Sequence, residues 1–377
     1  MVVFLAPAAL ALLATASALQ PPQRAERCRA RAQTVLRSAT ASSNVAKAQR
    51  KRQYRARQKA GVSPGGVAAR LRPPEGLETL FDAFDEELEA ALARYVVDWA
   101  DVPRDARPRK GRPGPRTRGK ELQCEAFLAI IDGLQLPEGA RVLDIGSGQG
   151  GLTLPLAAKH PSLEVVGVDV DKILAAQLNE RAAIAGLGNA RGWAGRAEDF
   201  DEAADLVVAL HACGFATDIA VAQAVARRAP FVAYPCCLGK VGVNANANAN
   251  ADADAGYSNG REFVRSGRLP RAVTASATRL PRSDWLRAQM DARQFGDLCR
   301  AAEHADAAGR AAKAATELDR CLAVAGDGYA VRMARNPHFV GDPDFAHRPH
   351  EIVILGYPDD GRWDDAVARL IGGGGVS

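Results

Sequence analysis

The sequence predicts an α/β fold of the Rossmann-like type: a central, mostly parallel seven-stranded sheet that ends in an antiparallel hairpin. A glycine-rich turn follows an aliphatic run within residues 140–151. Two apolar runs, residues 205–214 and 231–237, bracket a helical segment, which is typical of two parallel strands joined by a helix. Two further runs, residues 329–335 and 351–357, predict the closing hairpin.

The glycine-rich turn predicts a nucleotide site. Gly146, Gly148 and Gly150 allow the close backbone approach that a bound nucleoside requires. Gly151 also completes G-x-G-x-x-G, which binds a dinucleotide pyrophosphate. Asp144 distinguishes the two cases, because a carboxylate here repels a pyrophosphate but suits the ammonium and sulfonium of S-adenosylmethionine (SAM). We therefore predict the class I SAM-dependent methyltransferase fold, with SAM as the cofactor.

Further acidic residues complete the predicted cofactor site. Asp169 lies near the end of the strand predicted within residues 164–171, where an acid meets ribose hydroxyls. Its alternative role is the N-cap of the following helix, for which Asp171 fits better. Glu198 and Asp199 follow the next weak strand and could accept hydrogens from the adenine amine. A solvated acidic turn is the alternative interpretation of this pair.

His211, Cys213, Cys236 and Cys237 stand at the ends of the two predicted parallel strands, where α/β sheets bind ligands. We predict them as the catalytic group. His211 could be the general base for a hydroxyl, or a histidine satisfied within the sheet edge. A cysteine could instead attack C6 of a pyrimidine. Zinc binding stays a third alternative, although adjacent cysteines chelate one tetrahedral ion awkwardly, so we predict no metal.

The same residues carry a family resemblance. LHACGFATDIA, residues 210–220, and FVAYPCCLGK, residues 231–240, resemble the methyltransferase region of the glutathione S-transferase C-terminal domain-containing proteins. More distantly they resemble the tRNA 2'-O-methyltransferase of the acceptor stem. The resemblance spans residues 119–358 and implies methyl transfer. We expect RNA, either tRNA or rRNA, as substrate and partner; protein, a small molecule, or a non-catalytic SAM-binding scaffold are the alternatives.

The N-terminal part predicts targeting. Residues 1–18 are apolar and end in Ala16-Ser17-Ala18, which is typical of a signal peptide. Residues 19–72 hold fourteen lysines and arginines against one acid, a transit-peptide-like composition. We therefore expect a plastid protein without stable membrane association after processing. The secretory pathway is the alternative location, and an RNA-binding tail is the alternative role of the basic segment.

Residues 73–120 predict a leading helix and a basic linker. An i, i+4 apolar stripe within residues 78–98 requires a partner face and predicts a helix packed on the domain. Residues 104–120 hold eight basic residues and one acid, interleaved with proline and glycine. This segment could contact RNA phosphates or be a solvated flexible linker.

We predict the SAM-dependent methyltransferase domain over residues 121–358. Within it, residues 242–260 contain NANANANADAD and are expected to be a disordered insertion. Helices are expected over residues 283–302 and 310–325, and residues 359–377 are assigned as a C-terminal tail. Nothing in the sequence indicates an oligomeric state.

Overall fold

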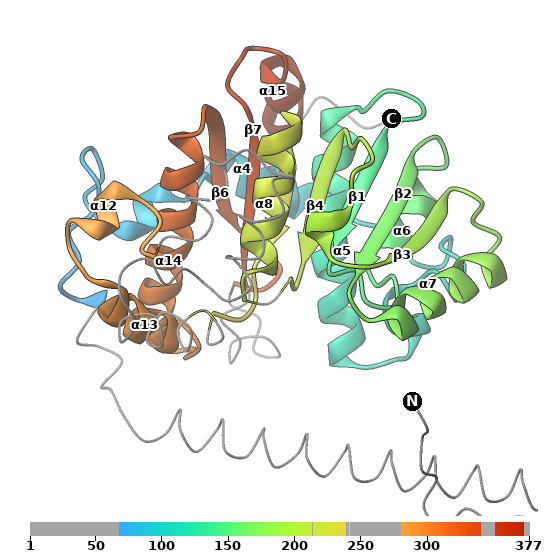
Figure 1. Cartoon of the computed structure of the whole chain (residues 1–377), viewed down its shortest axis with the longest axis horizontal. Helices are drawn as coiled ribbons and strands as arrows, with labels where there is room; N and C mark the ends of the chain where they lie inside the picture. The colour runs from blue at the N-terminus through green and yellow to red at the C-terminus, as the bar shows by residue number, and fades with distance from the viewer. Residues whose placement is uncertain (1–67, 213, 239–240, 242–279, 341–350, 373–377) are drawn as a thin grey trace, which may run out of the picture. The chain divides into compact units, whose positions relative to one another are not determined.

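The computed structural model describes residues 68–212, 214–238, 241, 280–340 and 351–372 (Figure 1). The predicted signal peptide, nearly all of the predicted basic segment 19–72 and the predicted insertion 242–260 lie outside the described residues. Cys213 also lies outside them.

The described chain contains a seven-stranded sheet in the order β3-β2-β1-β4-β5-β7-β6. Its strands are β1 (Arg141–Ile145), β2 (Glu164–Asp169), β3 (Ala190–Ala194), β4 (Leu206–Leu210), β5 (Phe231–Tyr234), β6 (Tyr329–Arg335) and β7 (Ile352–Pro358). Neighbouring strands from β3 to β5 pair in parallel, whereas β7 pairs antiparallel with both β5 and β6. The predicted parallel sheet with its closing hairpin is confirmed.

Helices cover both faces of the sheet (Figure 1). The α-helices are α4 (Glu86–Arg94), α5 (Pro115–Leu134), α6 (Thr153–Lys159), α7 (Lys172–Ile184), α8 (Ala216–Arg227), α12 (Asp284–Arg287), α13 (Ala292–Ala301), α14 (Ala307–Ala325) and α15 (Asp364–Gly372). Short 3-10 helices are η1 (Leu80–Ala83), η2 (Pro108–Gly111) and η3 (Ala197–Asp199).

The sheet is buried on both of its faces. Consecutive strand residues face opposite sides, so Val207 belongs to the core under α8, α13 and α14, and Val208 to the core under α4, α5, α6 and α15. This burial on both faces explains why β4 and β5 are continuous apolar runs.

The predicted leading helix is divided in two. Phe84 is extended and closes η1, and Asp85 then accepts a hydrogen bond from the backbone N–H of Leu88 to cap α4. An N-cap carboxylate stabilises a new helix start, which explains why the apolar stripe does not form one helix. The predicted packing is confirmed, because α4 contacts α5, α15 and β6.

The prediction of a flexible linker over residues 104–120 is wrong in its C-terminal part. Gly114 caps α5 and Pro115 occupies its first position, where the missing proline N–H costs nothing. The boundary predicted between residues 120 and 121 therefore falls inside α5.

The predicted C-terminal tail also contains a packed helix. α15 buries Ala366, Val367 and Leu370. A Cβ atom on Gly133 of α5 would lie 2.6 Å from Cβ of Leu370, so the two helices approach closely at this glycine. The tail prediction is therefore wrong for α15.

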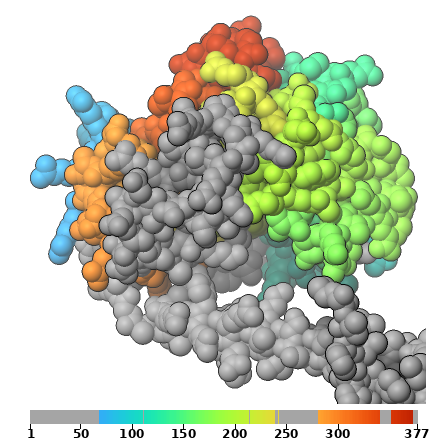
Figure 2. All heavy atoms as spheres, in the orientation of Figure 1, coloured from blue at the N-terminus to red at the C-terminus, as the bar shows by residue number. Residues whose placement is uncertain are grey.

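The helix predicted over residues 283–302 is also two helices, because Ser283 caps α12 and Asp291 forms a capping box at α13. In Figure 2 the first described residues, in blue, lie beside the orange segment that contains α12. The indole N–H of Trp285 in α12 donates to the carbonyl of Arg72 at 3.0 Å. Among the described helices, none combines the length and hydropathy needed to cross a bilayer.

Candidate active site

The three glycines of the β1 turn all adopt positive φ: 75° at Gly146, 56° at Gly148 and 79° at Gly150. They serve different purposes. A Cβ atom on Gly150 would lie 2.8 Å from side-chain atoms of Leu154 and Leu178, so this glycine permits close packing. A Cβ atom on Gly148 would meet nothing within 4 Å. Gly148 therefore exposes its backbone to open space that a ligand can enter.

Asp169 stands at the end of β2, beside this open space. Its Oδ2 accepts a hydrogen bond from the backbone N–H of Gly148 at 2.9 Å, and its Oδ1 accepts one from the N–H of Asp171. Asp171 caps α7 through a hydrogen bond from the N–H of Ile173. The capping role thus belongs to Asp171, and Asp169 is placed against the glycine turn.

Asp144 is buried, with only 1% of its surface exposed, which leaves little of its carboxylate open to a direct contact with the cofactor. Its Oδ2 accepts hydrogen bonds from the backbone N–H of Thr153 at 3.1 Å and from its hydroxyl at 2.6 Å. Thr153 begins α6, whose first amides lack intrahelical acceptors, so Asp144 anchors that helix to the turn. Burial raises the pKa of Asp144 to about 7, although the bonds from Thr153 oppose the shift.

The acidic pair after β3 lies in η3. Glu198 pairs with Arg196 at 3.0 Å, and its side chain is 10% exposed. Asp199 lies in the same short helix, which a hydrogen bond from Gln223 to the carbonyl of Ala197 holds against α8. A contact of Glu198 or Asp199 with adenine stays a prediction.

The ends of β4 and β5 meet beside the glycine turn. The backbone N–H of His211 donates to the carbonyl of Tyr234 at 3.2 Å, and that of Gly214 donates to the carbonyl of Cys237 at 3.3 Å. A Cβ atom on Gly146 would lie 3.6 Å from Ala212, which connects the β1 turn to the same edge. The structure thus brings the backbone of His211 and Cys237 together at one edge of the sheet with the predicted cofactor turn.

His211 has a left-handed backbone, with φ of 59°, which is uncommon for a residue with a side chain. Its Nε2 lies 2.7 Å from Oε1 of Gln123, a buried residue of α5. Such strain tends to persist at functional sites where the surrounding structure holds it in place.

Sequence reasoning missed three buried polar residues close to His211: Gln123, Tyr234 and Asn336. Tyr234 is fully buried, which raises its pKa, and hydrogen bonds with Asn336 and Gln123 oppose the shift. Asn336 donates through Nδ2 to the carbonyl of Leu122 at 3.1 Å. Gln123 and Asn336 lie far apart in the sequence and belong to no motif, so only the folded chain reveals that both form hydrogen bonds with Tyr234.

The cysteine pair follows β5. Cys236 is buried and Cys237 is half-buried. Sequence reasoning also missed Lys313 of α14, whose Nζ donates to the carbonyl of Pro235 at 3.1 Å. Within the described part of the chain, no group of three or more His, Cys, Asp or Glu residues is arranged to hold a metal ion.

Residues 119–243 match the family model described as a methyltransferase domain. The chain is 30% identical over 146 residues to the human glutathione S-transferase C-terminal domain-containing protein, covering 38% of this chain and 23% of that protein. The Xenopus laevis protein is 29% identical over 165 residues, covering 44% of this chain and 26% of its own length. The chain thus spans about a quarter of these curated relatives.

A shorter match is with ribosomal RNA small subunit methyltransferase G of Mycobacterium marinum, 37% identical over 75 residues, or 20% of this chain and 32% of that protein. Among solved structures, magnesium protoporphyrin IX methyltransferase from Synechocystis with bound SAH shares 11% identity at a TM-score of 0.36, covering 66% of this chain and 89% of that one. Residues 119–243 therefore match a methyltransferase domain, and the sheet order agrees with the class I fold expected from the sequence.

Proposed function

We propose that this chain transfers the methyl group of SAM to RNA, either tRNA or rRNA. The RNA assignment depends mainly on a group of exposed arginines that lies beside the glycine turn after β1. The acceptor would lie at the carboxyl ends of β4 and β5, next to that turn.

The residues present fit the cofactor. Gly148 leaves open space at its Cα, and Asp169 presents a carboxylate beside it, suited to ribose hydroxyls. Asp144 lies at the base of the turn and ionises near neutral pH, and its ionised form favours a cationic ligand. When bound, SAM supplies a methyl group on a sulfonium as the electrophile. Alignment supplies most of the rate of such a displacement, since positioning can be worth about 7–11 kcal/mol.

The exposed arginines precede and begin α5. They are Arg104, Arg109, Arg112, Arg116 and Arg118. Asp105 is the only acid between Arg104 and Arg118. An array of this kind neutralises phosphates, so the acceptor it suits is a polyanion.

Arg181 of α7 fixes this segment at the cofactor site. Its guanidinium donates to the carbonyl of Gln149 in the glycine turn at 2.6 Å. The same group donates to the carbonyls of Arg107 at 2.8 Å and Asp105 at 2.9 Å. One buried side chain thus ties the arginine segment to the loop that is expected to hold SAM. This supports binding of RNA close to the reacting methyl group.

His211 is the proposed proton acceptor for a ribose hydroxyl. Because the amide oxygen of Gln123 can only accept a hydrogen bond, Nε2 of His211 carries the proton and Nδ1 is the basic nitrogen. The hydroxyl proton would pass to Nδ1 as the oxygen attacks the methyl group. The similarity to an rRNA methyltransferase over 75 residues agrees with an RNA acceptor.

The test is transfer of tritium-labelled methyl from SAM to separated RNA, protein and small-molecule fractions by the purified chain. We expect label in RNA, recovered after digestion as a methylated nucleoside. Label only in protein or small molecules would contradict the RNA assignment. SAM binding without label in any fraction would instead identify a non-catalytic scaffold.

A pair of charge reversals tests the arginine surface. Arg112→Glu with Arg116→Glu should weaken RNA binding and lower the salt dependence of log Kd by about 0.7–0.9 for each phosphate that the protein no longer neutralises. The matched control reverses Arg94 and Arg369, which lie where α4 meets α15, away from the carboxyl ends of the parallel strands. If the two double variants weaken RNA binding equally, the arginines that precede and begin α5 do not form a specific RNA-binding surface.

We also propose that residues 1–72 direct the protein to a plastid. The apolar start and the acid-poor basic segment support this. A fusion of residues 1–72 to a fluorescent protein, expressed in an algal host with complex plastids, is expected to enter the plastid. Fluorescence in the cytosol or in the secretory pathway would contradict it.

A further inference from the structure

Lys313 of α14 reaches the loop that carries the cysteine pair. Its side chain is 2% exposed, and its Nζ donates to the carbonyl of Pro235 at 3.1 Å and to Oε1 of Glu317 at 2.8 Å. Pro235 directly precedes Cys236 and Cys237 at the end of β5. A single ammonium therefore connects α14 to the Pro235–Cys237 turn.

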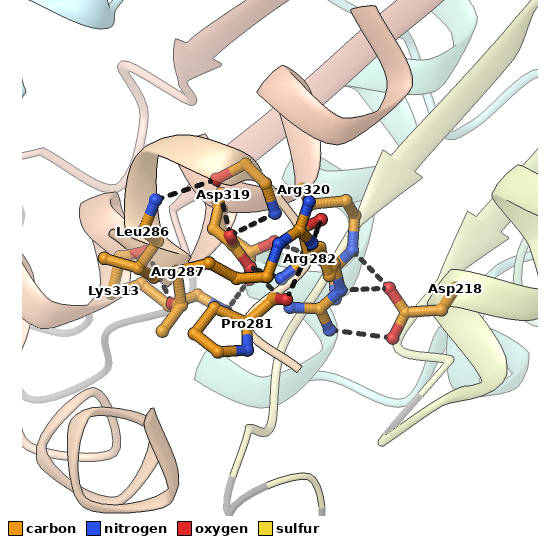
Figure 3. Close-up of polar contacts among 11 residues, drawn as sticks. Asp218, Pro281, Arg282, Leu286, Arg287, Lys313, Asp319 and Arg320 are labelled. Atoms are coloured by element: carbon orange, nitrogen blue, oxygen red, sulfur yellow. Dashed lines mark hydrogen bonds and ion pairs between the residues drawn. The ribbon is translucent and has the colours of Figure 1, made fainter. Parts of the chain in front are cut away.

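Lys313 belongs to a continuous set of buried ion pairs, which we call the buried charge network. Figure 3 shows its part around Arg282, Arg320, Asp218 and Asp319. Glu317 also pairs with Arg320. Arg320 contacts Asp218 of α8 at 3.0 Å, and Arg282 contacts Asp218 at 2.7 Å and Asp319 at 3.3 Å. The network contains three basic and three acidic side chains, each between 0% and 3% exposed: Lys313, Arg282, Arg320, Asp218, Glu317 and Asp319.

Such a network is a poor way to gain stability. Removing charges from water costs several kcal/mol for each ion, and apolar replacements of buried pairs are often neutral or stabilising. Buried ion pairs instead fix groups in one arrangement, although Nη2 of Arg320 has no hydrogen-bond partner among the described residues. This network joins α8, α14 and the segment before α12, and it ends at a backbone carbonyl of the acceptor edge.

We propose that Lys313 is a positioning residue of the acceptor site: it fixes the Pro235–Cys237 turn through the Pro235 carbonyl and keeps a positive charge at the turn that carries both thiols. The buried charge network holds that ammonium in place. The effect on turnover rests on the proposed methyl transfer, whereas the effect on the thiols does not.

The charged and titratable groups around Lys313 come from several elements. Burial lowers the pKa of Lys313 to about 8, and Arg320 lowers it further, whereas the two thiols and Glu303 oppose the shift. Glu317 pairs with the ammonium directly. Lys313 is therefore charged at neutral pH and loses its proton as the pH rises through about 8.

Steady-state kinetics give the first test. Lys313→Met keeps the apolar stem and removes the charge, and we expect kcat to fall about tenfold or more while the Kd for SAM changes less than twofold. Lys313→Arg is expected to recover part of kcat and to move the alkaline fall in activity, near pH 8 in the wild type, to higher pH. Thr316→Val is the matched control, because Thr316 is equally buried on the same helix but uncharged. The control should keep the wild-type kcat.

Thiol alkylation gives a test that needs no activity. The rate of Cys237 alkylation is measured by peptide mass spectrometry as a function of pH. The pH at which this rate reaches half of its maximum should be about 0.5 pH unit or more higher in Lys313→Met than in the wild type. Thr316→Val should keep the wild-type midpoint. If Lys313→Met does not fold, Glu317→Gln replaces it, and the alkaline fall in activity and the alkylation profile should then both shift.

Unchanged kcat and an unchanged alkylation profile in a folded Lys313→Met protein, or in Glu317→Gln, would overturn the proposal. If Lys313→Met shifts the alkylation profile but the wild type transfers no methyl group, the positioning role of Lys313 stands and the proposed function is overturned. The two failures are therefore distinguishable.

Discussion

Nε2 of His211, at the end of β4, lies 2.7 Å from Oε1 of Gln123 on α5. Gln123 also forms a hydrogen bond with the buried Tyr234 of β5 that opposes the rise in the phenol's pKa, as a donating amide N–H does. The amide oxygen therefore faces the imidazole, and the ring is held as the Nε2–H tautomer. A side chain on a covering helix thus determines which nitrogen of His211 is basic.

Substitutions at His211 and Gln123 should separate catalysis from binding. His211→Ala is expected to lower kcat about 10²-fold or more with little change in SAM affinity. Gln123→Leu removes the tautomer-fixing bond, worth about 1 kcal/mol, and should lower kcat about fivefold. Single-turnover kinetics with labelled SAM measure both effects. A normal kcat in His211→Ala would show that this histidine is only part of the sheet edge.

Asp169 and Asp171 offer a matched pair two residues apart. Asp169→Ala should weaken SAM binding by about 1–3 kcal/mol, the expected cost of stranding polar partners. Asp171→Ala removes the N-cap of α7 and should cost about 1 kcal/mol of stability without affecting SAM affinity. Titration calorimetry and thermal unfolding measure the two quantities. Equal SAM affinity in both variants and the wild type would contradict the placement of the ribose.

SAM affinity should depend on pH through Asp144. Its pKa is raised to about 7 by burial, so the unliganded protein largely holds this proton below neutrality. A cationic ligand favours the ionised carboxylate. We therefore expect SAM affinity to rise as the pH increases through about 7 and then level off, with proton release on binding. Calorimetry in buffers of different ionisation enthalpy measures this release, and Asp144→Asn should abolish it.

The same shift predicts the sign of the stability change. Because the folded pKa of Asp144 lies above its usual 3.8, the folded state binds more protons than the unfolded state between these values. The free energy of unfolding contributed by Asp144 is present at low pH and is lost as the pH rises through about 7. Denaturant unfolding of the wild type and Asp144→Asn at pH 5 and pH 8 measures it. If the free energy of unfolding changes equally between pH 5 and pH 8 in the wild type and in Asp144→Asn, the raised pKa of Asp144 is wrong.

The cysteine alternative makes a distinct prediction. If Cys236 or Cys237 attacks a pyrimidine, the corresponding Cys→Ser variant should lose all turnover, and RNA containing a 5-fluoropyrimidine should form a covalent adduct with the wild type. If His211 acts as the base, both serine variants should retain turnover and no adduct should form. Denaturing gel electrophoresis of labelled RNA with the protein distinguishes these outcomes.

The features that could be predicted from sequence are those encoded locally. The glycine turn, the Asp171 cap, the apolar strands and the closing hairpin each depend on residues adjacent in the chain, and the structure contains all of them. The start of α5 at Pro115 was also encoded locally, but the basic residues around it suggested a linker.

The features that could not be predicted depend on tertiary contacts. Gln123 meets His211 across 88 positions of the chain, and Lys313 meets Pro235 across 78. Neither pair leaves a periodic or motif signal. The contact of Asp144 with the cofactor, directly or through water, stays a prediction, and its hydrogen bonds to Thr153 depend on how α6 enters the domain.

A crystal structure of the chain with S-adenosylhomocysteine will show whether one edge of the sheet holds both the cofactor and the acceptor residues. We expect the ligand over Gly148, its ribose hydroxyls on Asp169, and its sulfur facing the ends of β4 and β5. His211 or a cysteine of the Pro235–Cys237 turn should lie within about 10 Å of that sulfur, so that an acceptor atom fits between them at attack distance. A ligand bound elsewhere, or a sulfur more than about 10 Å from all of these side chains, would show that the cofactor and the acceptor residues do not share this edge.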